Sequence, residues 1–106
     1  MGTWINVAAA SQLSVGTFRT IELDDTDIAV FNVDGEYFAI EDICTHDGGI
    51  LTGGTIEGDH VVCPRHGAHF SIKTGAALSP PAYEAVNTFP VRVKDGMVQV
   101  MDNRWD

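Results

Sequence analysis

Cysteine and basic residues are both scarce in this 106-residue chain, and each scarcity narrows what the protein can be. Six lysines and arginines stand against fifteen aspartates and glutamates, which gives a formal net charge of -9 at pH 7. Nucleic-acid binding needs a basic surface that neutralises phosphates, so this composition predicts that nucleic acid is not a partner. An acidic surface instead favours solubility and steers encounters toward basic patches on other proteins.

Long apolar runs are absent from the sequence as well. No segment approaches the roughly 20 consecutive apolar residues that are needed to cross a bilayer. The first residues also lack the basic, apolar and small-residue order of a secretory signal. The sequence therefore predicts a cytoplasmic protein without membrane contact. In that compartment the two cysteines are expected to be reduced, and such cysteines usually bind metal or take part in catalysis.

Short β-branched and aromatic runs, separated by turn signals, make up most of the chain. This pattern predicts an all-β fold, and the length favours one domain over residues 1–106. Asp34-Gly35 and Asp95-Gly96 are strong signals for β-hairpins. In the last run, Phe89, Val91 and Val93 are expected to face inward. The expected strands are residues 3–7, 17–23, 28–33, 36–40, 89–94 and 97–101.

The middle of the chain, residues 43–81, has a different composition. It contains seven glycines and three prolines, together with both cysteines and all four histidines. Residues that bend the chain at this density indicate tight loops with short strands between them. The sequence therefore predicts a β scaffold that carries one loop-rich segment, in which the candidate ligands are concentrated.

Two strings in this segment pair a cysteine with a histidine: Cys44-Thr45-His46 and Cys63-Pro64-Arg65-His66. Sixteen residues separate His46 from Cys63. Two thiolates and two imidazoles suit zinc or an iron–sulfur cluster. Cys₂His₂ zinc sites usually space their paired cysteines by two to four residues. Mixed Cys/His pairs instead suit a two-iron cluster in which one iron takes both thiolates and the other takes both imidazoles.

These strings resemble the ligand motifs of the Rieske family. The resemblance extends to Gly67-Ala68-His69-Phe70 after the second pair, to Lys73-Thr74-Gly75 and to Ser79-Pro80-Pro81. It implies a Rieske fold, in which an antiparallel β-sandwich or barrel base carries a loop-rich cluster-binding subdomain, here approximately residues 43–81. It also implies one Rieske-type [2Fe–2S] cluster. The implied ligands are Cys44 and Cys63 on one iron and His46 and His66 on the other.

Departures from the high-potential branch of the family indicate a ferredoxin. That branch has two further cysteines, where this chain is expected to have Gly49 and Arg65, and two hydroxyl side chains, where it is expected to have Ala68 and Phe70. Hydrogen bonds to sulfur raise the reduction potential. Their loss predicts a potential toward the low end of the Rieske range, about -150 mV.

The ferredoxin branch implies a soluble one-electron carrier and no catalytic residue. Such a carrier takes electrons from a flavin-containing NAD(P)H-dependent reductase and passes them to the terminal Rieske non-heme iron oxygenase of an aromatic dioxygenase system. The expected form is a monomer in transient redox complexes. No histidine follows His69, so we expect no mononuclear iron site in these residues. The small subunit of NADH-dependent nitrite reductase and a structural zinc module are the alternatives.

Several other residues carry weaker expectations. His60 and His69 are interpreted as surface or structural histidines, because the ligand pattern is complete without them. Glu41, Asp42 and Asp47 flank the first ligand pair and are candidates for partner docking. Trp4 is expected in the core, and Pro80-Pro81 is expected to shield the cluster from water.

Overall fold

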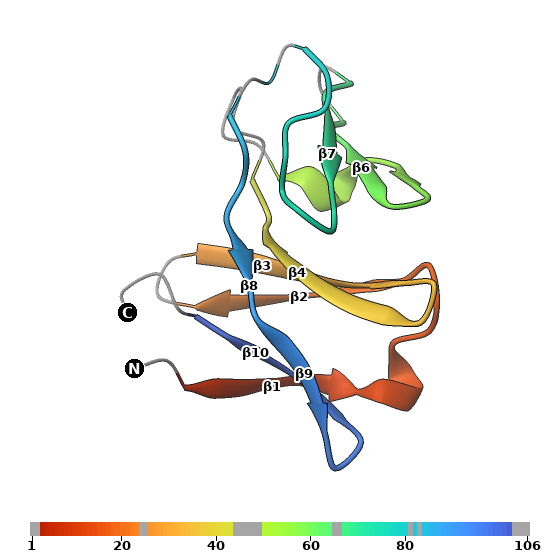
Figure 1. Ribbon diagram of the computed structural model, residues 1–106, viewed down its shortest axis with the longest axis vertical. Coiled ribbons are helices and arrows are strands. Elements are labelled where there is room, and N and C mark those ends of the chain that lie inside the picture. The colour runs from red at the N-terminus through yellow and green to blue at the C-terminus, as the bar shows by residue number, and fades with distance from the viewer. Residues whose placement is uncertain are drawn as a thin grey trace.

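The computed structural model describes residues 3–23, 26–43, 50–64, 67–80, 82 and 84–102. Within these ranges the regular structure is almost entirely antiparallel strand, in three small sheets, with only short 3₁₀ turns besides. Two sheets form a base. The third is a separate sheet that lies beyond one end of β4 (Figure 1). The predicted all-β class is confirmed. No helix in the described part of the chain has the length and apolarity of a membrane span.

The four-stranded sheet has the order β2 (Phe18–Leu23), β3 (Thr26–Val33), β4 (Glu36–Glu41) and β8 (Thr88–Phe89). Its β3–β4 hairpin turns at Asp34 and Gly35, where φ is 53° and 92°. Positive φ at both positions defines the type I′ turn that Asp-Gly favours, which confirms the predicted hairpin.

The second sheet of the base has the order β1 (Trp4–Ala9), β10 (Met97–Met101) and β9 (Val91–Lys94). Asp95 and Gly96 form the expected hairpin turn, with φ of 53° and 78°.

The single strand predicted over residues 89–94 is wrong. Phe89 ends β8, which pairs with β4, whereas Val91 begins β9, which pairs with β10. Pro90 separates them because a proline has no N–H to donate to a ladder. The chain thus changes sheet at this residue, and Val93, expected to face inward, is 49% exposed.

The expectation that Trp4 lies in the core is also wrong. Trp4 is half-buried on the sheet, and the guanidinium of Arg92 stands 4.2 Å from its ring centre. Arg92 Nε in turn donates a hydrogen bond of 2.7 Å to Gln99 Oε1. The indole ring is therefore in cation–π contact with Arg92.

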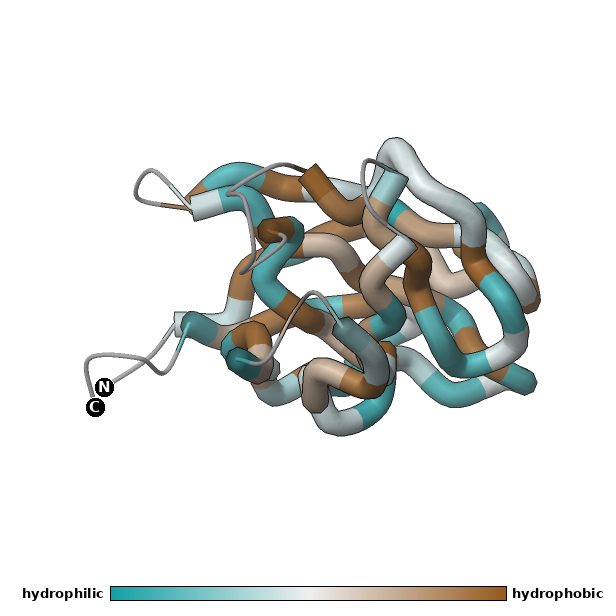
Figure 2. Tube along the Cα trace, turned by 90° about the horizontal axis from the view of Figure 1, so that it is seen from above, coloured by the Kyte–Doolittle hydropathy of each residue, from teal (hydrophilic) through white to brown (hydrophobic). Residues whose placement is uncertain are grey.

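Strand β3 is buried on both faces, and this explains its almost continuous apolar run, residues 28–33. One face packs against the second sheet, and the other packs against the third. The first core contains Leu13, Ile28, Val30, Ala39, Phe89, Val98 and Val100. Figure 2 shows apolar residues in brown and polar residues in teal, interspersed along the chain.

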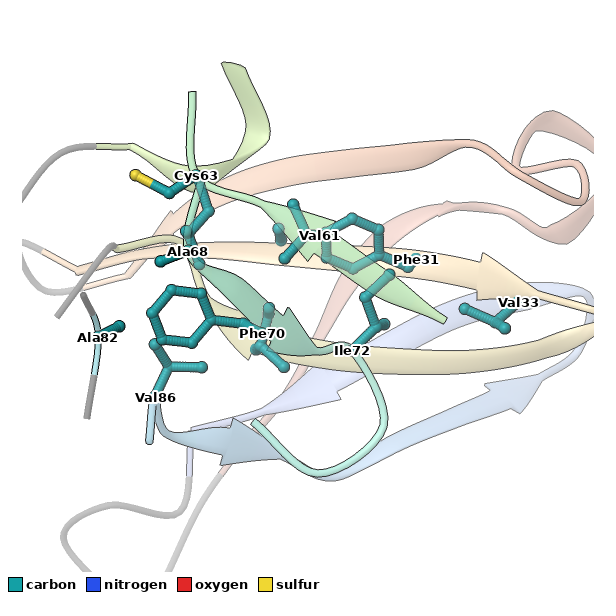
Figure 3. Close-up of a cluster of buried hydrophobic side chains, with 12 residues drawn as sticks. Phe31, Val33, Val61, Cys63, Ala68, Phe70, Ile72, Ala82 and Val86 are labelled. Atoms are coloured by element: carbon teal, nitrogen blue, oxygen red, sulfur yellow. The ribbon is translucent and has the colours of Figure 1, made fainter. Parts of the chain in front are cut away.

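The third sheet has the order β5 (Ile56–Glu57), β6 (His60–Val62) and β7 (His69–Ser71). The second core joins it to the base: Phe31 of β3 lies in one cluster with Val61, Phe70 and Ile72 (Figure 3). These four side chains are almost fully buried. The residues around Cys63 are thus attached to the base by a core of their own.

Gly75 lies where the chain leaving β7 passes close to Val86. Its φ is 77°, and a Cβ atom there would collide with the Val86 carbonyl oxygen. The Val86 N–H donates a hydrogen bond of 2.9 Å to the Gly75 carbonyl oxygen, which holds the two residues close together. Only glycine meets both requirements, of left-handed backbone and of close approach.

We predict that Gly75→Ala lowers the free energy of unfolding by roughly 3 kcal/mol, the sum of the left-handed backbone cost and overpacking. Gly16→Ala is the matched control, because Gly16 has a similar φ of 83° but nothing within 4 Å of its added Cβ. It should cost only about 1 kcal/mol. Urea unfolding of both variants measures the difference, and equal losses would show that the Val86 contact is unimportant.

Candidate metal centre

Cys63 opens the loop that joins β6 to β7, and this loop is closed by its own backbone. The Cys63 N–H donates to the Ala68 carbonyl oxygen at 2.7 Å, and the Gly67 N–H donates to the Cys63 carbonyl oxygen at 3.0 Å. Gly67 adopts a φ of 73°, which favours glycine at this turn. These bonds fix the backbone of Cys63, the first residue of the second Cys-x-x-His string, at the start of the loop. Arg65 and His66 lie outside the described residues.

The Cys63 side chain lies at one end of the second core, with 2% of the residue exposed. Figure 3 shows its sulfur pointing away from Val61 and from the ring of Phe70. Within the described part of the chain the sulfur has no hydrogen-bond partner, and its neighbours Ala68 and Phe70 carry no hydroxyl. A buried thiol directed away from its apolar neighbours fits a metal ligand, and the Cys₂His₂ donor set fits a Rieske cluster.

The first ligand string lies outside the described residues, since Cys44 and His46 belong to residues 44–49. The chain on both sides of this string is described and is tied together. Both oxygens of the Asp42 carboxylate accept hydrogen bonds from Thr52, one from its N–H at 2.9 Å and one from its hydroxyl at 2.7 Å. Asp42 is 6% exposed.

The interpretation of Asp42 as a docking residue is therefore wrong, because its carboxylate is buried and already paired. Glu41 is half-buried and accepts a hydrogen bond from Asn87 Nδ2 at 3.1 Å. Asp47 lies outside the described residues. Sequence reasoning missed the Asp42–Thr52 pair, because their separation of ten positions hides the contact in a linear pattern.

The segment that follows the first string packs directly against the second. Leu51 of the 3₁₀ turn η2 (Leu51–Gly53) is buried in the same core as Cys63. Gly54 lies so close to the Val62 carbonyl that an added Cβ would collide with it and would also stand only 3.1 Å from the Pro64 ring. The Val62 N–H donates to the Thr55 carbonyl oxygen at 2.8 Å. The segment that follows the first Cys/His string is thus brought against the chain at the start of the second.

The proline-bearing loop is fastened to β7. Ser79 Oγ accepts a hydrogen bond of 3.0 Å from the His69 N–H, and the Leu78 N–H donates to the His69 carbonyl oxygen at 2.7 Å. The loop therefore runs beside the second ligand hairpin. Pro80 is exposed, and Pro81 lies outside the described residues, so the shielding role of this pair stays a prediction.

His60 and His69 lie on adjacent strands with their rings in contact. The ring centres are 5.9 Å apart at an interplanar angle of 85°, and His60 Nε2 is 3.2 Å from a carboxylate oxygen of Asp59. The His60 and Asp59 side chains are both partly exposed, at 41% and 47%. Among the described residues, no three His, Cys, Asp or Glu side chains group as a metal site. The ligand set of Cys44, His46, Cys63 and His66 accordingly stays a prediction.

Comparison with known proteins identifies the family of the chain. Residues 3–90 match the Rieske [2Fe-2S] domain. The chain belongs to this family, and the predicted Rieske fold is confirmed. The family and its ferredoxin relatives imply a Rieske-type [2Fe–2S] cluster as the cofactor.

The most similar relatives include several named ferredoxins. "Ferredoxin CarAc" of Metapseudomonas resinovorans is 39% identical over 98 residues, which cover 92% of each chain. The "3-phenylpropionate/cinnamic acid dioxygenase ferredoxin subunit" of Photorhabdus laumondii is 40% identical and covers 89% of this chain and 90% of its own. A naphthalene 1,2-dioxygenase ferredoxin component of Pseudomonas putida is 30% identical, covering 92% of this chain and 93% of its own.

Solved structures give the same result. A chain in a complex of reduced oxygenase and oxidized ferredoxin in carbazole 1,9a-dioxygenase superposes with a TM-score of 0.87 at 39% identity, covering 92% of this chain and 91% of that one. The ferredoxin of Sphingomonas yanoikuyae B1 superposes with a TM-score of 0.86 at 33% identity, covering 94% and 99%. At these sequence identities, the similarity of both structures to this chain extends beyond the fold.

We predict that Gly54→Ala disrupts the contact between the segment after the first Cys/His string and β6. The added Cβ would collide with the Val62 carbonyl, and backbone atoms can shift only at a substantial cost in free energy. Bound iron per protein should fall well below the wild-type value. Gly53→Ala is the control, since its Cβ would stand an ordinary 3.7 Å from the Pro64 ring. Iron content of the two purified variants measures the effect. A fully loaded Gly54→Ala protein would show that this contact does not shape the centre.

Proposed function

We propose that the protein is a one-electron carrier whose [2Fe–2S] cluster is held by Cys44, His46, Cys63 and His66. The placement of Cys63 carries this proposal: a buried sulfur at the start of a closed hairpin, beside the segment that follows Cys44 and His46. The two thiolates would hold one iron and the two imidazoles the other. When bound, the cluster supplies one-electron redox chemistry. Residues 1–106 form a single Rieske domain, with residues 43–81 as its cluster-binding part.

The partners we propose follow from the relatives. Two of the relatives named above are ferredoxin components of dioxygenase systems, and one similar structure is a complex of an oxygenase with a ferredoxin. This chain accordingly takes electrons from a flavin-containing NAD(P)H-dependent reductase and passes them to a terminal Rieske non-heme iron oxygenase acting on an aromatic compound. Its place is the cytoplasm, where NAD(P)H is available. It performs no catalysis itself.

Exposed apolar side chains next to the ligand positions support transient docking. Ile50 is 55% exposed and follows the first ligand string, while Leu78 is 46% exposed on the loop fastened to β7. Pro64 and Pro80 are also exposed. These residues can exclude water from a small contact without making it permanent, as redox encounters require. The net charge of -9 would speed the approach to a basic partner surface.

We predict a red-brown protein whose reduced state gives an EPR signal with an average g value below that of all-cysteine clusters. Cys63→Ser should abolish the visible absorption, because a hydroxyl replaces a thiolate ligand. His69→Gln should keep it, since His69 packs against His60 and lies outside the predicted ligand set. Visible and EPR spectra of the three proteins test this. A colourless wild-type protein containing stoichiometric zinc would make the chain a structural zinc module instead.

We also predict that the reduced protein delivers electrons to a terminal oxygenase but leaves aromatic substrate unchanged alone. A reconstituted mixture of reductase, this protein and oxygenase should consume NADH only when all three are present. The rate should fall as salt screens the acidic surface. Hydroxylated product formed from dithionite-reduced protein without oxygenase would contradict the carrier role.

A further inference from the structure

The Asp42 carboxylate is one of the few buried polar groups among the described residues, and the electron-carrier role does not by itself account for it. Its backbone N–H donates to the Asp27 carbonyl oxygen at 2.8 Å, which continues the β3–β4 pairing one residue past β4. The carboxylate then bonds to Thr52, ten residues further along the chain. Asp42 therefore connects the rigid base to the far side of the first ligand segment.

The two hydrogen bonds use both carboxylate oxygens and both donors of Thr52. A two-point contact fixes orientation as well as distance, which a single bond does not. The segment closed by this contact contains Cys44 and His46. Ile43 and Leu51 also anchor the two ends in the core, but apolar packing fixes orientation less closely than two hydrogen bonds do. A ligand-bearing loop with loose ends has more conformations to lose when metal binds.

We propose that Asp42 is a positioning residue for the metal centre, acting through Thr52 to hold the ends of the segment that carries Cys44 and His46. This contact between Asp42 and Thr52, called the clamp below, narrows the range of positions open to both ligands and slows the loss of metal. Groups that orient metal ligands from outside the coordination shell have measurable effects of this kind on affinity. The inference rests on the proposed function for the identity of the two ligands.

Three variants separate the parts of the clamp. Asp42→Ala removes both hydrogen bonds and should speed metal release about ten- to a hundredfold. Thr52→Val keeps the backbone bond, loses the hydroxyl bond, and should show an intermediate rate. Asp42→Asn should recover most of the wild-type rate. Its amide oxygen still accepts from the Thr52 N–H, and its amide nitrogen donates to the Thr52 hydroxyl oxygen.

Asn32 offers a matched control elsewhere in the same sheet. It is also 6% exposed, and it makes two hydrogen bonds, from Nδ2 to the Leu13 carbonyl oxygen at 2.8 Å and from the Gly35 N–H at 2.9 Å. It lies five positions along β3 from Asp27, which is about 17 Å of strand. Asn32→Ala should therefore lower the stability of the base while leaving the metal centre as it is.

The experiment measures release of bound metal from the holoprotein to a chelator, together with reduced-state EPR g values and urea unfolding. Faster release and shifted g values in Asp42→Ala and Thr52→Val, but not in Asn32→Ala, support the clamp. Equal release rates in Asp42→Ala and Asn32→Ala overturn it. If Asp42→Ala does not fold, Thr52→Val decides, and a wild-type release rate in that variant overturns the proposal.

The same measurement separates the clamp from the carrier role. A wild-type protein that holds zinc would contradict the carrier, while zinc release from the same variants still decides the clamp. A wild-type protein that binds neither iron nor zinc would overturn both.

Discussion

The burial of one sheet on both faces is the constraint on which the rest of this structure depends. Strand β3 places Val30 in the core shared with the second sheet and Phe31 in the core shared with the third. Its neighbour β4 does the same with Ala39 and Ile40. A small domain has little apolar surface to bury, so a central sheet that serves two cores uses it efficiently. Because both cores share these strands, the third sheet cannot shift without disturbing the base.

The position of β8 beside β4 extends this constraint to the whole loop-rich part. The chain leaves the base after Glu41 and returns to it at Thr88, and these ends are neighbours: Ile40 pairs with Thr88, and the Glu41 N–H donates to the Asn87 carbonyl oxygen at 2.8 Å. The residues between them thus form a long connection whose two ends are fixed side by side. Such a connection can be rich in glycine and proline without destabilising the base, since the entropic cost of closing a loop grows only slowly with its length.

The sequence predicted most of the base and the chemistry of the centre, because both follow local rules. The Asp34-Gly35 and Asp95-Gly96 hairpins depend on two-residue turns, and the ligand motifs depend on donor types. What it failed to predict depends on distant contacts. Alternation continued through Pro90. The proline disfavours a continuous strand, but no local feature indicated that the chain changes partner there. Asp42 was interpreted as a surface acid because its acceptor role requires Thr52, which only the folded chain brings near.

The described links around the centre are made by the protein alone, and this bears on how well it would serve as an electron carrier. A backbone turn at Cys63, close packing at Gly54 and the Asp42 carboxylate each hold one part of the ligand-bearing chain. None of these contacts uses a metal ligand atom. A framework held by such contacts need not rearrange when the charge of a bound centre changes by one electron, and preorganised surroundings keep the cost of such a change small. The exposed apolar side chains of Ile50 and Leu78 lie on segments joined to this framework, and a partner of the proposed carrier can contact them and leave without refolding either protein.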